Sequence, residues 1–212
     1  AVLTNAIPLT VTRSLFYANE AVETGGAIYF NVIEAPTEAL IENTTFSANS
    51  AAQGGAIHGD NEAAVSIRSS TFAGNNANEA GALAFPMQVQ ASIFADNTGG
   101  TCLLSLVSGG YNVVDDATCG LNLSSDQSET DALLTALADH GGSTLTHALL
   151  PISPALNIIA VCPTLLDQRG YTRPIGATCD AGAVEMSVTP LPAPVGLTAG
   201  VNGGVVTLNW LD

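Results

Sequence analysis

A short pattern of hydrophobic and polar positions recurs four times along the first hundred residues of the chain. Each copy reads Ser/Thr-x-Phe-x-x-Asn, and a short apolar stretch precedes the phenylalanine motif, as at 64–67. The copies occupy 14–19, 44–49, 70–75 and 92–97. Their phenylalanines are 30, 26 and 22 residues apart. Self-similarity at this period is typical of repeat architectures, in which each repeat packs on its neighbours.

A second motif, Gly-Gly-Ala-Ile or a weaker form of it, follows the first three copies. It occupies 25–28, 54–57 and 80–83. Each repeat therefore holds three short stretches rich in β-branched residues, with turn residues between them. Three such stretches in one repeat are typical of one coil of a parallel β-helix. We expect an all-β parallel solenoid over 1–186, with about eight coils if each takes roughly 22 residues.

Stacked coils place equivalent residues one above another, with strands about 4.8 Å apart. The phenylalanines are expected to form an internal aromatic row: Phe16, Phe46, Phe72 and Phe94. The asparagines are expected to form a ladder at a bend, with an amide that bonds the neighbouring coil and a backbone that tolerates left-handed angles: Asn19, Asn49, Asn75 and Asn97. The second glycine of each pair permits a tight corner: Gly26, Gly55 and Gly81. These roles are structural rather than chemical.

The composition and charge of the chain limit the kinds of molecule that it can bind. The chain has 19 acidic residues against 4 arginines and no lysine, which gives a formal net charge of −15. Nucleic acid is excluded as a natural partner because phosphate binding needs clustered basic residues. No apolar run is long enough for a transmembrane segment. Hydrophobic residues make up 47% of the chain but aromatic ones only 5%, so the core is expected to consist of small and aliphatic side chains.

The four cysteines fall into two local pairs, Cys102 with Cys119 and Cys162 with Cys179, each 17 residues apart. Four cysteines allow three disulfide connectivities, and the matched spacing favours these two local bonds over the others. Four buried free thiols are the alternative. Two disulfides in an acidic chain without lysine indicate an extracellular or cell-surface location.

The repeats resemble those of polymorphic outer-membrane proteins and related bacterial surface β-helices. The C-terminal part is similar to the choice-of-anchor Q proteins, which are right-handed parallel β-helix proteins of the bacterial exterior. The matching segments occur in order at 110–114, 131–134, 139–151, 153–155, 167–170, 173–174 and 179–185. The chain departs from that pattern at His140, where Asn is usual, and at 157–159. The resemblance implies a secreted protein, and it supplies no catalytic residues.

Composition changes after residue 186. Residues 187–194 are rich in proline and are expected to form a stiff linker. Residues 195–212 resemble the first two strands of a fibronectin type III domain, with Trp210 at the core position of that domain. Two such strands are too few for a complete sandwich, so this segment is expected to be incomplete or to complete itself on another molecule.

Parallel β-helices include polysaccharide lyases and hydrolases, so the basic and acidic residues that these reactions need are relevant here. The lyase reaction needs basic groups, and only four are present: Arg13, Arg68, Arg169 and Arg173. The last two are expected to form ion pairs with Asp167, Asp180 or Glu185. The carboxylate pairs that a glycosidase would use fall in predicted turns or loops: Asp115 with Asp116, Asp60 with Glu62, and Glu34 with Glu38.

The histidines lack metal-ligand spacing: His58, His140 and His147. We expect His147 to be a hydrogen-bonded structural residue. Acidic loops are chemically suited to calcium, but no calcium-binding motif is present. The sequence therefore assigns no catalytic residue, no cofactor and no metal site.

Two hypotheses of function remain. The first is a non-enzymatic, structural or adhesive surface protein that associates with itself through its β-helix ends and C-terminal strands. The second is a carbohydrate-binding or polysaccharide-degrading protein of the same fold, whose partner would be an extracellular glycan. Carboxylates or aromatics clustered on one outer face would favour the second hypothesis, whereas the recurring phenylalanines are predicted to lie inside.

Overall fold

The computed structural model describes residues 2–5, 8–31, 38–59, 64–187, 195–202 and 205–211. In these ranges the protein contains only strands, turns and irregular segments, with no helix. The strands of the repeats are β1 (Val2–Asn5), β2 (Leu9–Thr12), β3 (Leu15–Tyr17), β4 (Ile28–Asn31), β5 (Glu38–Glu42), β6 (Thr45–Ser47), β7 (Ser50–Gln53), β8 (Ile57–Gly59), β9 (Ala64–Arg68), β10 (Thr71–Ala73), β11 (Asn76–Glu79), β12 (Gln88–Gln90), β13 (Ile93–Ala95), β14 (Val107–Ser108) and β15 (Val113–Val114). The all-β prediction is confirmed.

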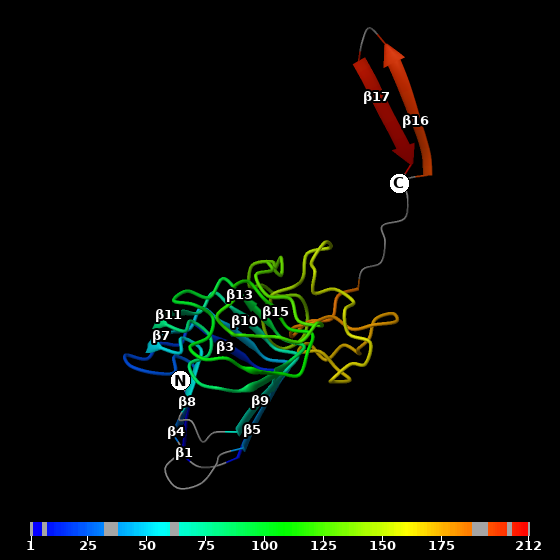
Figure 1. The fold of residues 1–212 in the computed structure, drawn as a ribbon. Helices are drawn as coiled ribbons and strands as arrows, with labels where there is room; N and C mark the ends of the chain where they lie inside the picture. The colour runs from blue at the N-terminus through cyan, green and yellow to red at the C-terminus, as the bar shows by residue number, and fades with distance from the viewer. Residues whose placement is uncertain are drawn as a thin grey trace.

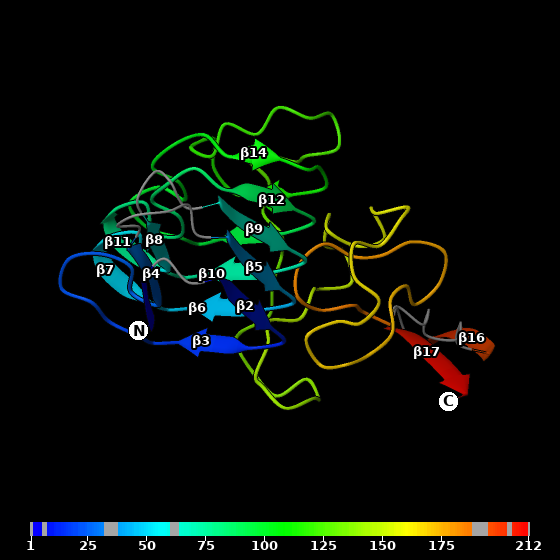
Figure 2. The ribbon, with the colours of Figure 1, turned by 90° about the horizontal axis from the view of Figure 1, so that it is seen from below.

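The strands of successive repeats pair in parallel. One five-stranded sheet has the order β15-β13-β10-β6-β3, and a second has the order β14-β12-β9-β5-β2. Smaller parallel sheets join β1, β4 and β8, and join β7 to β11. Figure 2 shows the strands of the second sheet stacked in this order. Each repeat thus adds one strand to each sheet at an equivalent position.

Side chains at every second position of the strands point inward and form the core between the sheets. Ile41, Ile67 and Val89 of the second sheet point inward and join Phe46 and Phe72 of the first sheet in one hydrophobic cluster. The inward residues are separated by polar or exposed ones, as the burial of β5 and β9 shows. This period of two is what a sheet with one buried face requires.

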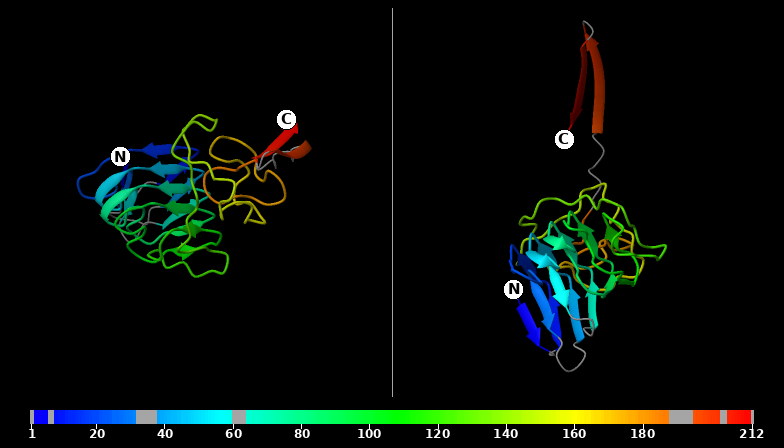
Figure 3. Two further views of the ribbon diagram at one scale, coloured as in Figure 1. Left: turned by 90° about the horizontal axis from the view of Figure 1, so that it is seen from above. Right: turned by 60° about the vertical axis from the view of Figure 1, so that its left-hand side comes forward.

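Beyond β15 the chain adds one more parallel bridge to the stack, between Val113 and Gln127, and then leaves it. Up to residue 187 it makes isolated bridges and turns instead of strands, so each large sheet has five strands rather than the eight coils expected. Drawn from yellow-green to orange, this segment lies along one side of the stacked strands in Figures 1 and 3. We call residues 130–187 the C-terminal brace.

The brace covers the outward face of the phenylalanine-bearing sheet. Ile93 and Ala95 of β13 point outward and pack in a second hydrophobic cluster with Leu149, Ile159 and other residues of the brace. Phe94, between them, points into the first cluster. Strands β6, β10 and β13 are therefore buried on both faces.

Both local cysteine pairs are bonded in the structure. Cys102 and Cys119 have a Cα–Cα distance of 4.9 Å, and Cys162 and Cys179 one of 5.7 Å. The first disulfide belongs to the repeat core. The second lies in the brace, where Cys179 also exchanges two backbone hydrogen bonds with Ile159.

Two further strands, β16 (Val195–Asn202) and β17 (Val205–Leu211), form a separate antiparallel sheet. They fall where the sequence predicts the fibronectin-like strands and are drawn in red in Figure 1. The proline-rich stretch 188–194 lies outside the described residues, as does Asp212. Within the residues described, no helix is long and apolar enough to span a bilayer.

Candidate functional site

The predicted asparagines form a continuous ladder along one corner of the stack. The backbone N–H and the side-chain Nδ2 of Asn49 both donate to Oδ1 of Asn75, at 3.0 and 2.9 Å. Nδ2 of Asn49 also donates to the carbonyl oxygen of Phe16 at 3.0 Å. The same bonds link Asn19 to Asn49 and Asn75 to Asn97. The side chain of Asn49 thus bonds four groups of the neighbouring repeats, two on Asn19 and one each on Asn75 and Phe16, which would otherwise lack these partners.

The expected left-handed backbone falls on a different residue. The positive φ angles lie one position before each asparagine: Ala18 (51°), Ala48 (53°), Gly74 (64°) and Asp96 (56°). The tolerance of asparagine for left-handed angles is therefore not used at these bends. The reason is that the asparagine N–H must point along the stack to reach the next Oδ1, and the preceding residue makes the bend.

A second ladder, which the sequence analysis missed, uses the Ser/Thr that opens each motif. The N–H of Thr44 donates to Oγ of Ser70, and the N–H of Ser70 donates to Oγ of Ser92, both at 3.3 Å. The N–H of Ser92 then donates to Oδ1 of Asn112 at 3.1 Å. The signal was present in the sequence, since a small hydroxyl residue recurs two positions before each phenylalanine.

The phenylalanines stack face to face. The ring centroids of Phe16 and Phe46 are 4.8 Å apart, those of Phe46 and Phe72 4.6 Å, and those of Phe72 and Phe94 4.9 Å. The last three rings are fully buried. These distances follow the strand spacing of the sheet, which places identical side chains directly above one another.

The three corner glycines lie against the backbone of the next repeat. A Cβ built on Gly81 would lie 2.5 Å from the carbonyl oxygen of Thr98 and 2.6 Å from that of Asn75. Gly26 and Gly55 meet the equivalent atoms of their own neighbours. No other side chain fits at these positions, so the requirement is close approach of backbones.

Most of the charged groups in the brace form one buried network. Arg173 forms an ion pair with Glu185 at 2.9 Å and donates to the carbonyl oxygens of Asp180 and Gly182. Arg169 forms an ion pair with Asp167 at 2.7 Å, which confirms the expected pairing of both arginines. Burial lowers the pKa of Arg173, and the negative charge of Glu185 acts in the opposite direction.

Asp180 is the one member of this network with a strongly shifted carboxyl group. Its Oδ1 accepts from the N–H of Asn157 and its Oδ2 from the N–H of Met186, both at 2.7 Å. Burial raises the pKa of Asp180 to about 6, although these two hydrogen bonds favour the charged form. The side chains of the network are hydrogen-bonded to backbone groups of the brace, so the network holds segments of the brace together.

Polar contacts join the brace to the outward face of the sheet. Thr45 donates through Oγ1 to Oε1 of Gln168 at 2.6 Å, and Oγ1 of Thr71 accepts from the N–H of Ala183 at 3.0 Å. Ser47 lies 3.0 Å from Nε2 of His147. These bonds join residues that are 100 to 123 positions apart in the sequence, which is why no local pattern indicates them.

His147 is hydrogen-bonded on both ring nitrogens, as expected. Its Nδ1 lies 2.8 Å from the carbonyl oxygen of Thr135, and its Nε2 faces Ser47. Burial lowers the pKa of His147. His140 lies in a turn of the brace with Nδ1 3.0 Å from the carbonyl oxygen of Thr146, and His58 packs against the ring of Tyr29.

The adjacent carboxylates Asp115 and Asp116 close a loop. Asp116 accepts from the N–H groups of Thr101 and Thr118 and from the hydroxyl of Thr118, while Asp115 accepts from the N–H of Asp96. Burial raises the pKa of Asp115; for Asp116 burial acts in the same direction, but the hydrogen bonds from Thr118 and Thr101 prevail and lower its pKa. Both side chains have backbone partners in the turn that the sequence predicts.

Of the remaining candidate carboxylates, the structure describes only Glu38. Asp60, Glu62 and Glu34 lie outside the described residues, and Glu38 lies on the exposed start of β5. Within the ranges that the structure describes, no three histidine, cysteine or acidic side chains gather as metal ligands.

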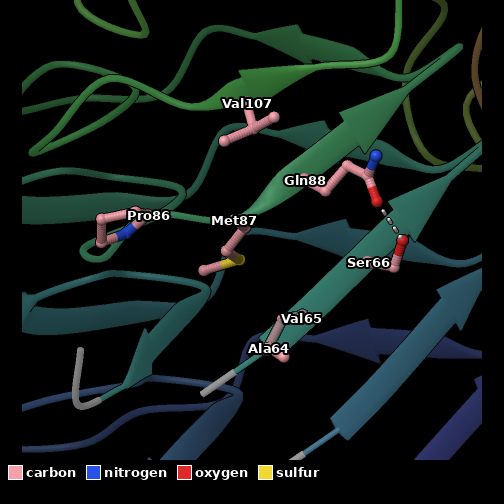
Figure 4. Close-up of a pocket in the computed structure, with 7 residues that line it drawn as sticks. All are labelled: Ala64, Val65, Ser66, Pro86, Met87, Gln88 and Val107. Carbon is pink, nitrogen blue, oxygen red and sulfur yellow. Dashed lines mark hydrogen bonds between the residues drawn. The ribbon is translucent and has the colours of Figure 1, made fainter. Parts of the chain in front are cut away.

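The outward face of the second sheet carries two shallow depressions. One, of about 240 Å³, is lined by Ala64, Ser66, Gln88, Val107 and three neighbours. Figure 4 shows Ser66 and Gln88 joined by a hydrogen bond across adjacent strands, which spans 3.2 Å. The other, of about 330 Å³, shares Ala64 and Ser66 and extends over β5 to β2. We call the two depressions together the trough; their lining is mostly apolar, with polar groups from Thr10, Glu38, Ser66 and Gln88.

Comparison with family models, with curated proteins and with solved structures found no match to this chain. The site must therefore be interpreted from its own geometry.

Proposed function

We propose that the protein is a non-enzymatic, structural or adhesive protein of the bacterial exterior, built as a right-handed parallel β-helix of the choice-of-anchor Q type. The observation that carries this proposal is the double ladder of hydrogen bonds along the stack, capped sideways by the brace. A framework that repeats one set of bonds from coil to coil is suited to rigidity and display. Two disulfides are suited to an oxidising compartment.

The carboxylates support the same proposal, because the buried ones are used to hold backbone. Asp167 accepts from the N–H groups of Arg169, Tyr171 and Glu185. Asp126, which is half-buried, accepts from the N–H of Asn112 and from the hydroxyl of Ser108. A carboxylate with this many fixed partners is poorly suited to exchange protons with a substrate.

Self-association is part of the proposal. Among the described strands, β3 pairs with β6 alone, and its Phe16 is the last ring of the described row, in the orientation that a ring of another copy would continue. An unpaired strand edge is a template for further pairing. The C-terminal strands β16 and β17 offer a second edge.

Sedimentation velocity over a range of concentrations tests this association. We expect assemblies that grow with concentration, and we expect Phe16→Asp to reduce them because it places a charge in the row that the next coil would extend. Val22→Asp is the matched control, since Val22 is 91% exposed in a loop. Equal assembly of both variants, or a monomer throughout, would reject association through β3.

Carbohydrate binding is the second candidate, supported by the trough on the open sheet. Its hydroxyl and amide groups, from Thr10, Ser66 and Gln88, are suited to sugar hydroxyls. A glycan array with the wild-type protein and Gln88→Ala tests it. Binding that is lost in Gln88→Ala supports this candidate, and binding that is unchanged places the sugar elsewhere.

A further inference from the structure

Ser47 and His147 are arranged as a nucleophile and a base. Oγ of Ser47 lies 3.0 Å from Nε2 of His147, and Nδ1 of the same ring lies 2.8 Å from the carbonyl oxygen of Thr135. A carbonyl oxygen only accepts, so Nδ1 carries the proton and Nε2 presents its lone pair. The hydroxyl of Ser47 therefore donates to Nε2, which is the geometry of general-base activation.

The position of Ser47 differs from its neighbours in the stack. In register with it stand Tyr17 on one side and Ala73 on the other, followed by Ala95. Only Ser47 places a small hydroxyl in this row. The repeat pattern does not require that hydroxyl, because alanine occupies the same position in the next two coils.

A pocket opens at this pair of side chains. It has a volume of about 240 Å³ and is lined by Ser47, Ala48, Ala73, Gly74, Asp96, Leu134, Thr135, Ala136 and His147. Apart from Asp96 the lining is mostly small and apolar. Gly74 leaves open space, since a Cβ built there would meet no atom within 4 Å. The pocket therefore suits a small uncharged molecule, and the carboxylate of Asp96 disfavours an anion.

We propose that Ser47, activated by His147, is a covalent acceptor for the acyl group of a small uncharged ester that enters this pocket. Oγ bonds to the carbonyl carbon, the bond from that carbon to the leaving oxygen breaks, and the proton of Oγ passes to Nε2 and then to the leaving group. The products are acyl-serine and an alcohol.

The backbone N–H groups next to Ser47 are not available to stabilise the oxyanion of this reaction. The N–H of Ala48 donates to the carbonyl oxygen of Ala73, and the N–H of Gly74 to that of Ala95, so neither is directed at an oxyanion. An oxyanion hole normally contributes a large part of acyl-transfer catalysis. We therefore expect stoichiometric acylation with slow release rather than rapid turnover.

The test uses the oxidised full-length chain with two probes, p-nitrophenyl acetate and a fluorophosphonate. We expect a burst of about one p-nitrophenolate per chain, and peptide mass spectrometry should place both labels on Ser47. Ser66 is the matched control serine, because its hydroxyl donates to an amide oxygen of Gln88 and has no base. Labels spread over several serines, or absent from Ser47 in the wild-type protein, would overturn the proposal.

Two variants separate activation from folding. His147→Gln keeps a hydrogen-bonding side chain without a base, and we expect it to slow labelling of Ser47 about 100-fold while the chain still unfolds cooperatively. Ser47→Ala should abolish the burst. The wild-type labelling rate should rise with pH to a plateau, with a midpoint below the ordinary pKa of histidine. Burial lowers the pKa of His147 and the charge of His140 acts in the same direction, whereas the hydrogen bond to Thr135 and the charge of Asp96 oppose them. A His147→Gln protein that labels at the wild-type rate would show that Ser47 is not activated.

Discussion

At the scale of single residues, the asparagines do more for the fold than their small side chains suggest. The amide of Asn49 accepts two hydrogen bonds from Asn19 and donates one to Asn75 and one to the carbonyl oxygen of Phe16. All four bonds join Asn49 to a neighbouring repeat along one corner of the stack, and Asn49 is fully buried. If the Asn49 side chain is removed, water therefore cannot reach the groups that it bonds.

Replacement of Asn49 by Ala should lower the free energy of unfolding by about 2–4 kcal/mol, since it leaves buried N–H and C=O groups without partners. Asn49→Asp is the matched variant, because it keeps the acceptor and loses the donors. Chemical denaturation measures both. A loss below about 1 kcal/mol in Asn49→Ala would contradict the ladder.

The phenylalanine row makes a separate prediction. Phe72 is fully buried and stacks on Phe46 and Phe94. Phe72→Ala or Phe46→Ala should cost about 3–5 kcal/mol in the free energy of unfolding, from lost burial and the cavity left behind. Phe16→Ala should cost less, because Phe16 is only partly buried. Equal costs for Phe16 and Phe72 would show that the ring contacts do not follow burial.

The corner glycine Gly81 and the bend glycine Gly74 differ in what surrounds them. Gly81→Ala should cost about 3 kcal/mol or more, because its Cβ would meet two carbonyl oxygens of the stack. Gly74→Ala should cost about 1 kcal/mol, from its φ of 64° alone, since open space surrounds it. Thermal unfolding of the two variants measures the difference, and the reverse order would contradict the close approach at Gly81.

At the scale of elements, the strands of the repeats were predictable and the brace was not. The repeated letters of Ser/Thr-x-Phe-x-x-Asn report which residues stack, because a parallel ladder places identical positions together. The contact between Thr45 and Gln168 joins positions 123 residues apart and has no period. Sequence reasoning could pair Arg173 with a nearby carboxylate, but it could not show that residues 130–187 fold back over the sheet.

The left-handed turns illustrate the same limit. Ala18 and Ala48 adopt positive φ, although alanine carries no sequence signal for it. The asparagine next in sequence does carry that signal. The ladder hydrogen bonds depend on the stack as a whole, and they determine whether the asparagine or the residue before it adopts the left-handed angles.

The brace should make stability depend on pH through Asp180. Its pKa is about 6 in the folded protein and has a reference value of 3.8. A raised pKa contributes stability that is fully present below about pH 4 and is lost as the pH rises through 6. We expect Asp180→Asn to remove a slope worth about 3 kcal/mol between these limits. Denaturation midpoints at several pH values measure it, and an identical slope in the variant would contradict the assignment.

At the scale of the whole molecule, two sets of interactions act in different directions. The Asn and Ser/Thr ladders, the ring row and the parallel sheets join repeats along the stack, whereas the brace covers it from one side. The interactions along the stack repeat from coil to coil, so another copy could extend them. The contacts of the brace do not repeat. This division is the physical reason for proposing growth along the stack and display across it.

The most direct test of this account is electron microscopy with fibre diffraction on the concentrated, disulfide-intact protein. We predict filaments with a meridional spacing of about 4.8 Å, because the strands would stack along the filament axis. Discrete particles at every concentration would contradict self-assembly, and filaments with that spacing on the equator would contradict growth along the stack.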